Sequence, residues 1–265
     1  MRQSNIYKRF RHRISLWRDA RENSTFTGFC RLPTQFEALA DPVVGFLLKD
    51  EADRKLRIIV FGCSNGAEAY TVSSILHQRC SGLNFKVFAC DIDSCMIEKA
   101  KTACYQTKEI YNNKIIRDSF INFTFNQDGN RFKVKEEIAK SVCFEKADAL
   151  DTGLKNSIGP ADILFAQNFL FHMKPKASLM ALRNLCGLLK PKAVLFIDGV
   201  DINIRKKITK RLKLEPLDYK IKEIHNEAMR ARAVGWPYSY WGLEPFMTSS
   251  KNWRRRYATI FKKGS

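Results

Sequence analysis

Short apolar runs alternate with helix-like stretches along the middle of the chain, and each run leads into a polar loop. Short, β-branched apolar runs are typical of strands buried in a parallel sheet. We expect five such strands, at residues 57–61, 85–90, 141–144, 162–166 and 193–197. Strands that alternate with helices at this pace predict an α/β protein with a parallel, doubly wound sheet.

The helices between these strands are predicted from their apolar spacing and flanking residues. The clearest stretches lie at residues 67–77, 94–103 and 176–189. The last of them should stop at Lys190-Pro191, because proline cannot continue a helix. Residues 111–141 are polar and weakly patterned. Within them only residues 127–130 clearly predict an element, which is a turn.

The N-terminal part of the chain differs from this core, which we place at residues 51–200. Residues 1–50 are expected to form a helical segment that packs on the core. In its first part, one helix face carries Ile6, Phe10, Ile14 and Trp17 among many arginines. Such a face packs on the domain behind it, lies on a membrane surface or belongs to an organelle-targeting segment.

The C-terminal part, residues 201–265, is basic and rich in aromatic residues. We expect it to complete the sheet, with Tyr257–Phe261 as a strand antiparallel to its neighbours. The aromatic residues between 236 and 246 either belong to the core or form a lid that covers the acceptor site and keeps water from the reaction.

The bulk charge is the most unusual property of the sequence. The 46 lysines and arginines outnumber the 27 acidic residues, which gives a formal net charge of +19. Such an excess attracts polyanions and acidic partners but says nothing about the fold. Nucleic acid, an anionic membrane surface and an acidic protein are all open as partners, and so is a solvated basic surface with no specific partner.

Cysteine usage and hydropathy bear on the location of the protein. None of the eight cysteines forms a CxxC pair, and most lie in apolar runs, where a thiol behaves as a small hydrophobe. A reducing compartment is the economical interpretation, so we expect a cytoplasmic protein. No apolar run approaches the roughly 20 residues that cross a bilayer, and no transmembrane segment is expected. The spacing of histidines and cysteines predicts no metal site.

The strongest candidate for chemistry is the loop Gly62-Cys-Ser-Asn-Gly66, between the first strand and the helix after it. Its glycines allow the backbone to approach a ligand without Cβ clashes, and the helix start offers free N–H groups to a polar or anionic group. The spacing is GxxxG and lacks the third glycine of pyrophosphate binders, which favours an adenosyl amino acid over a dinucleotide. The same glycines also fit an ordinary strand-to-helix turn.

Polar side chains follow the later strands at their carboxyl ends. Asp91 ends the second strand and is placed to accept both ribose hydroxyls of a nucleoside, while Asp93 is the better N-cap for the next helix. Asp148 follows the third strand and is placed to meet an adenine edge. Asn168 follows the fourth strand, where the reacting groups should gather. Asp148 and Asn168 fit loop caps or turn residues equally well.

Four co-linear stretches resemble the chemotaxis receptor methyltransferases of the CheR type. Residues 61–70 (FGCSNGAEAY) are similar to the glycine-loop motif of that family, residues 89–93 (ACDID) to its acidic strand end, and residues 161–170 (ADILFAQNFL) to its strand-end Asn motif. Upstream, residues 27–39 resemble its first motif, with TGFCR followed by FEAL. The resemblance implies a Rossmann-like class I methyltransferase with a mostly parallel seven-stranded sheet, helices on both faces, and S-adenosyl-L-methionine as cofactor.

The resemblance also implies roles for particular residues. Glu68 would take the amino group of the methionine moiety, although an acid in a first helical turn is also favoured by the helix dipole. Arg31 would lie near the carboxylate of the cofactor or of the acceptor. The complete set of expected cofactor-binding residues is Thr27, Arg31, Gly62, Ser64, Gly66, Glu68, Asp91, Asp148, Ala149, Gln167 and Asn168.

The sequence departs from the family around the acceptor rather than around the cofactor. His172 stands where the family has a tyrosine, Gln167 stands where it has an arginine, and residues 191–199 lack its serine-glutamate pair. Arg31 and His172 are the catalytic candidates. His172 would serve as a general base, as an orienting group or as a filler of the tyrosine's space.

The leading prediction from the sequence is O-methylation of a carboxylate on an acidic protein or a small molecule. Two other classes stay open. One is a methyltransferase that acts on RNA or another polyanion held by its basic residues. The other is a non-catalytic binding module with the same fold. A nicotinamide oxidoreductase is disfavoured by the missing third glycine.

Overall fold

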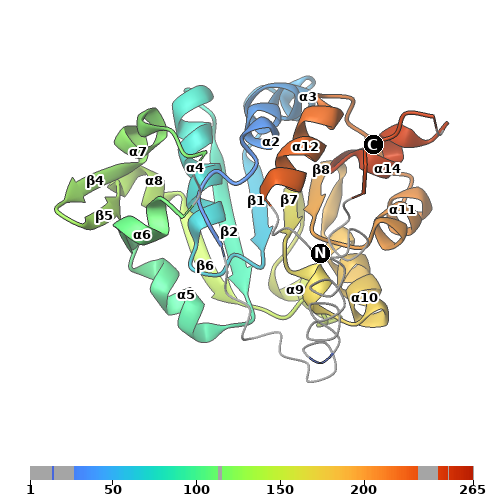
Figure 1. Ribbon diagram of the computed structural model, residues 1–265. Helices are drawn as coiled ribbons and strands as arrows, with labels where there is room; N and C mark the ends of the chain where they lie inside the picture. The colour runs from blue at the N-terminus through green and yellow to red at the C-terminus, as the bar shows by residue number, and fades with distance from the viewer. Residues whose placement is uncertain (1–13, 15–26, 113–114, 232–243, 250, 265) are drawn as a thin grey trace, which may run out of the picture. The chain divides into compact units, whose positions relative to one another are not determined.

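The computed structural model describes residues 14, 27–112, 115–231, 244–249 and 251–264 of the chain. Its main sheet has seven strands, in the order β6-β2-β1-β7-β8-β10-β9 (Figure 1). Parallel pairs join β1 to β2 and β2 to β6, whereas β10 is antiparallel to β8 and β9. The predicted α/β fold with a mostly parallel seven-stranded sheet is therefore confirmed.

The strands of this sheet lie close to where the apolar runs placed them. Their bounds are Leu56–Phe61 (β1), Phe85–Asp91 (β2), Val142–Lys146 (β6), Ala161–Gln167 (β7), Leu189–Asp198 (β8), Glu215–Pro216 (β9) and Ile260–Lys263 (β10). Every residue of β7 is buried, as expected for a strand covered on both faces.

The described residues form two compact units. The N-terminal unit comprises residues 27–148 and 161–163, and the C-terminal unit comprises residues 149–160 and 164–264. The division at residues 50 and 200 that the sequence suggests stays a prediction. Within the described part of the chain, no helix is both long enough and apolar enough to cross a membrane.

The register of the N-terminal unit brings its strand ends together. Phe61 at the end of β1 pairs with Cys90 of β2, and Asp91 pairs with Lys146 at the end of β6. The loops that follow these three strands therefore leave from one edge of the sheet. The helices of this unit are α2 (Pro33–Ala38), η2 (Leu39–Val43), α3 (Val44–Leu48), α4 (Ala67–Arg79), α5 (Ser94–Lys101), α6 (Thr107–Ile110), α7 (Asp118–Thr124) and α8 (Glu136–Lys140).

A small antiparallel sheet in this unit was not predicted. It has the order β3-β5-β4, with strands Cys104–Gln106, Arg131–Val134 and Phe125–Asp128, and α6 and α7 pack against it (Figure 1). The predicted turn at residues 127–130 is confirmed as the connection between β4 and β5. The sheet has a buried aromatic cluster, in which Phe29 contacts Tyr105 and Phe125 edge-on.

The C-terminal unit corrects two predicted boundaries. Helix α10 (Pro175–Cys186) ends before Lys190-Pro191, because the Gly187 N–H closes the last turn on the carbonyls of Arg183 and Asn184. Strand β8 then runs through the proline, which lies ahead of the stretch paired with β10.

The last strand is confirmed as antiparallel, but it starts at Ile260 rather than Tyr257, because residues 253–257 form helix α14 (Trp253–Tyr257). The other helices of this unit are α9 (Leu154–Ser157), η3 (Leu170–His172), α11 (Ile202–Arg211) and α12 (Ile221–Ala231). Apart from Ile14, the predicted N-terminal helix face lies outside the described residues, and so does most of the aromatic stretch 236–246.

Candidate cofactor site

The glycine loop between β1 and α4 has a backbone that ordinary residues rarely adopt. Gly62, Ser64 and Gly66 have φ angles of 74°, 48° and 87°. A Cβ atom on Gly66 would also lie 3.0 Å from the Ala100 side chain and 3.0 Å from the Phe144 ring. Both its conformation and its close packing therefore require glycine at position 66.

Asp91 fixes the shape of this loop. One carboxylate oxygen accepts the Ser64 N–H at 2.6 Å, and the other accepts the Asp93 N–H at 3.0 Å. Asp93 caps α5 instead, because its side chain accepts the N–H groups of Cys95 (2.8 Å) and Met96 (3.3 Å). The prediction that Asp93, rather than Asp91, caps this helix is therefore confirmed.

The Asp91 carboxylate has acceptor capacity beyond these two bonds. An ionised carboxylate offers about four lone-pair sites, of which the N–H groups of Asp93, Ser64 and Ile92 use at most three. Burial raises the pKa of Asp91, although the Asp93 and Ser64 N–H donors act in the opposite direction. The group is only partly buried, so it can accept hydroxyl donors from a ligand. These properties fit the ribose of an adenosyl cofactor.

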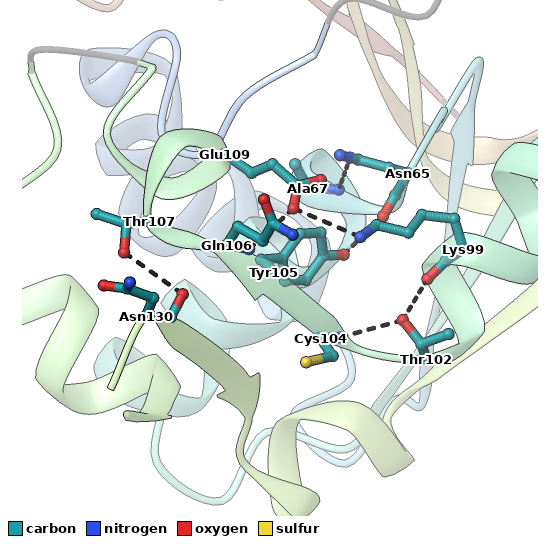
Figure 2. Close-up of polar contacts among 10 residues, drawn as sticks. All are labelled: Asn65, Ala67, Lys99, Thr102, Cys104, Tyr105, Gln106, Thr107, Glu109 and Asn130. Atoms are coloured by element: carbon teal, nitrogen blue, oxygen red, sulfur yellow. Dashed lines mark hydrogen bonds and ion pairs between the residues drawn. The ribbon is translucent and has the colours of Figure 1, made fainter. Parts of the chain in front are cut away.

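A buried tyrosine from the small sheet also supports the loop. The Tyr105 hydroxyl donates to the Asn65 carbonyl at 2.6 Å, and the Asn65 side chain in turn accepts the Ala67 N–H at 3.2 Å (Figure 2). Burial raises the pKa of Tyr105 well above its ordinary value, so its hydroxyl stays protonated and donates. The side chain is 1% exposed. Sequence reasoning missed this residue.

The segment that carries Thr27 and Arg31 lies against the same helix as Glu68. The Cys30 N–H donates to Thr71 Oγ1 on α4 at 3.3 Å, and Thr71 is one turn beyond Glu68. The neighbouring Phe29 is fully buried. Thr27, Arg31 and Glu68 are all partly exposed, as ligand-contacting side chains must be.

Asp148 belongs to the same edge of the sheet. The Ala147 N–H donates to the Asp91 carbonyl at 2.9 Å, so the pairing of β6 with β2 extends to the residue before Asp148. The structure thus brings eight of the predicted residues to the N-terminal unit: Thr27, Arg31, Gly62, Ser64, Gly66, Glu68, Asp91 and Asp148. Their contacts with a cofactor stay predictions.

The remaining candidates, Ala149, Gln167, Asn168 and His172, belong to the C-terminal unit. Asn168 has a φ of 61°, and its N–H donates to the Asp198 carbonyl at 3.0 Å. Gly199 packs so tightly here that a Cβ atom would lie 2.8 Å from the Asn168 Cα. Contacts with Asp198 and Gly199, at the end of β8, therefore hold the turn after β7 in place.

His172 and its neighbours complete this group. His172 is partly exposed at the end of η3, and its ring lies 3.8 Å from that of Phe171, measured between centroids. Gln167 is buried, and the Ala149 carbonyl accepts the Asn184 side-chain N–H at 3.1 Å. The role of His172 as a base, an orienting group or a filler stays a prediction.

Comparison with known proteins identifies the family of the chain. Residues 25–220 match the family model described as CheR methyltransferase, SAM binding domain. The chain is 27% identical over 179 residues to a probable biofilm formation methyltransferase of Pseudomonas aeruginosa, covering 67% of this chain and 42% of the relative. It is 29% identical over 157 residues to the chemotaxis protein methyltransferase of Escherichia coli, covering 57% of this chain and 54% of the relative.

The match thus spans only about half the length of these relatives. Among solved structures, magnesium protoporphyrin IX methyltransferase from Synechocystis has a TM-score of 0.36 and 16% identity, and the match covers 86% of this chain and 78% of that one. A likeness this distant adds nothing to the argument. The family match covers most of the chain and confirms S-adenosylmethionine as the cofactor. The chain belongs to the CheR methyltransferase family, and residues 25–220 are its S-adenosylmethionine-binding domain.

Proposed function

We propose that this chain transfers the methyl group of S-adenosylmethionine to a carboxylate of an acidic protein or small molecule. The observation that carries the proposal is the glycine loop fixed by Asp91, in a chain of the CheR methyltransferase family. A carboxylate oxygen forms the new bond to the methyl carbon, the bond from that carbon to sulfur breaks, and its electron pair returns to sulfur. The products are a methyl ester and S-adenosylhomocysteine.

The cofactor supplies an electrophilic methyl group on a sulfonium ion, and the residues of the chain supply binding and orientation. The free lone pairs of Asp91 suit the ribose hydroxyls, and Glu68 offers a negative charge for the ammonium group of the methionine moiety. The backbone of residues 62–66 provides the close approach that an adenosyl group needs. No base is required, because a carboxylate is already ionised at neutral pH.

The distribution of charge supports an acidic acceptor. The N-terminal unit has 17 lysines and arginines and 17 acidic residues, so its formal charge is zero. Residues 149–160 and 164–265, which hold the other described unit, have 22 basic and eight acidic residues. Most of the excess positive charge thus belongs to the part of the chain that carries Asn168 and His172. A concentrated charge of one sign attracts an oppositely charged partner and speeds its encounter.

Methyl transfer with labelled cofactor tests the proposal. We expect label in acidic proteins or peptides and its release as methanol under mild alkali, because methyl esters hydrolyse there whereas methyl ethers and methylamines do not. Glu68→Gln should lower incorporation, and Glu98→Gln, an exposed acid on α5, is the matched control. Alkali-stable label in RNA would support the second candidate, an RNA methyltransferase, to which the same basic residues are suited.

A further inference from the structure

A cavity separate from the predicted cofactor residues lies in the N-terminal unit. It has a volume of about 310 Å³ and lies between α2, the end of α4 and the start of α7. Its apolar lining is formed by Cys30, Pro33, Phe36, Ile75, Ile115 and Phe120. Ile115 is 41% exposed, so this side of the cavity is open to solvent. A volume of this order accommodates a small organic molecule.

The polar lining of the cavity is rich in donors. Four side chains, Gln78, Arg79, Arg117 and Ser119, line it and make no hydrogen bond or ion pair with another residue in the described part of the chain. All four are exposed. Two guanidinium groups that share a cavity without a carboxylate partner are suited to an anion.

Two other lining residues bear on the charge of the cavity. Glu37 is its one acidic lining residue, so the two arginines leave a net positive charge. The Cys30 thiol adds no negative charge, because burial raises its pKa to about 12 and it stays protonated at neutral pH. The cavity therefore combines an apolar floor, formed by the buried side chains of Phe36, Ile75 and Phe120, with the exposed and positively charged side chains of Arg79 and Arg117.

We propose that this cavity binds a small amphipathic carboxylate. The hydrocarbon part lies on Phe36, Ile75 and Phe120, and the carboxylate meets Arg79 and Arg117. Binding requires both halves of the ligand, since the floor offers no hydrogen bonds and exposed arginines alone hold a simple anion only weakly. None of the lining residues belongs to the set predicted to contact S-adenosylmethionine, so the proposal is independent of the methyl transfer.

Titration of the full chain with octanoate tests this site. The isoleucine methyl groups are followed by NMR, because Ile75 and Ile115 line the cavity and Ile208, in the C-terminal unit, does not. We expect saturable shifts of Ile75 and Ile115 with one dissociation constant, and none for Ile208. Octylamine and octanol, which keep the chain but lose the negative charge, should bind at least about ten times more weakly.

Two double variants separate a specific site from general attraction to a basic protein. Arg79→Gln with Arg117→Gln should weaken octanoate binding about tenfold or more. Lys108→Gln with Lys133→Gln removes two positive charges from exposed positions of the same unit, outside the cavity, and should leave the binding unchanged. The proposal is overturned if Ile75 and Ile115 do not shift, if octylamine binds as tightly as octanoate, or if both double variants behave alike.

Discussion

The support of the glycine loop by Tyr105 can be tested by removing one oxygen atom. Tyr105→Phe keeps the ring in the aromatic cluster, where it packs edge-on against Phe29 at 4.9 Å, and deletes the donor to the Asn65 carbonyl. The bond is short, at 2.6 Å, and the side chain is 1% exposed, so water does not readily replace it. Leaving a fully buried acceptor unsatisfied costs about 1–3 kcal/mol, and the Asn65 residue is only partly exposed.

We therefore expect the free energy of unfolding to fall by about 1–2 kcal/mol, with Tm lower by roughly 2–8 °C for a chain of this length. S-adenosylhomocysteine affinity should also fall, because Asn65 lies in the loop that is predicted to bind the cofactor. Calorimetric unfolding and titration measure the two effects.

Tyr111→Phe is the matched control. Tyr111 is 47% exposed, and removal of an exposed hydroxyl changes stability by less than about 0.5 kcal/mol. The reasoning is refuted if the Tyr105 and Tyr111 variants show the same stability and the same cofactor affinity.

Four further predictions concern the candidate site. Gly66→Ala should destabilise the fold by about 1–3 kcal/mol in thermal unfolding, because it combines a φ of 87° with a Cβ contact of 3.0 Å; Gly82→Ala, which has a φ of 80° but an open surrounding, should cost less. Asp91→Ala should weaken cofactor binding by about 1.5–3 kcal/mol, and Asp93→Ala should mainly lower stability by about 1 kcal/mol, so an exchange of the two phenotypes would contradict the assignment. Because burial raises the pKa of Asp91, the affinity of the wild type should fall on acidification at a higher pH than for an ordinary aspartate. For a carboxylate acceptor, the rate should be flat between about pH 6 and 8 and His172→Phe should change mainly the acceptor KM; a rise through that range that His172→Phe abolishes would favour a hydroxyl or amine acceptor.

The buried parallel strands were predictable because their side chains face the interior on both sides. Strand β1, for example, is buried at five of its six positions, and all of its residues except Arg57 are apolar. Because β1 and β2 pair in parallel, their carboxyl ends lie side by side. Asp91, at the end of β2, therefore lies beside the glycine loop that follows β1, as predicted.

The small sheet was not predictable in the same way. Strand β5 alternates buried and exposed residues, but it is only four residues long, and β3 has three. Patterns this short occur often in loops. Tyr105 was missed for the same reason: its bond to Asn65 joins residues 40 apart, and the pairing with β5 that positions it leaves no local pattern.

Titration calorimetry with S-adenosylhomocysteine tests the central claim, that the loop held by Asp91 binds the adenosyl cofactor. The account predicts one site per chain, no comparable binding of NAD, and a loss of about tenfold or more in affinity for Asp91→Ala. Tighter binding of NAD than of S-adenosylhomocysteine, or an Asp91→Ala variant that binds as well as the wild type, would contradict it.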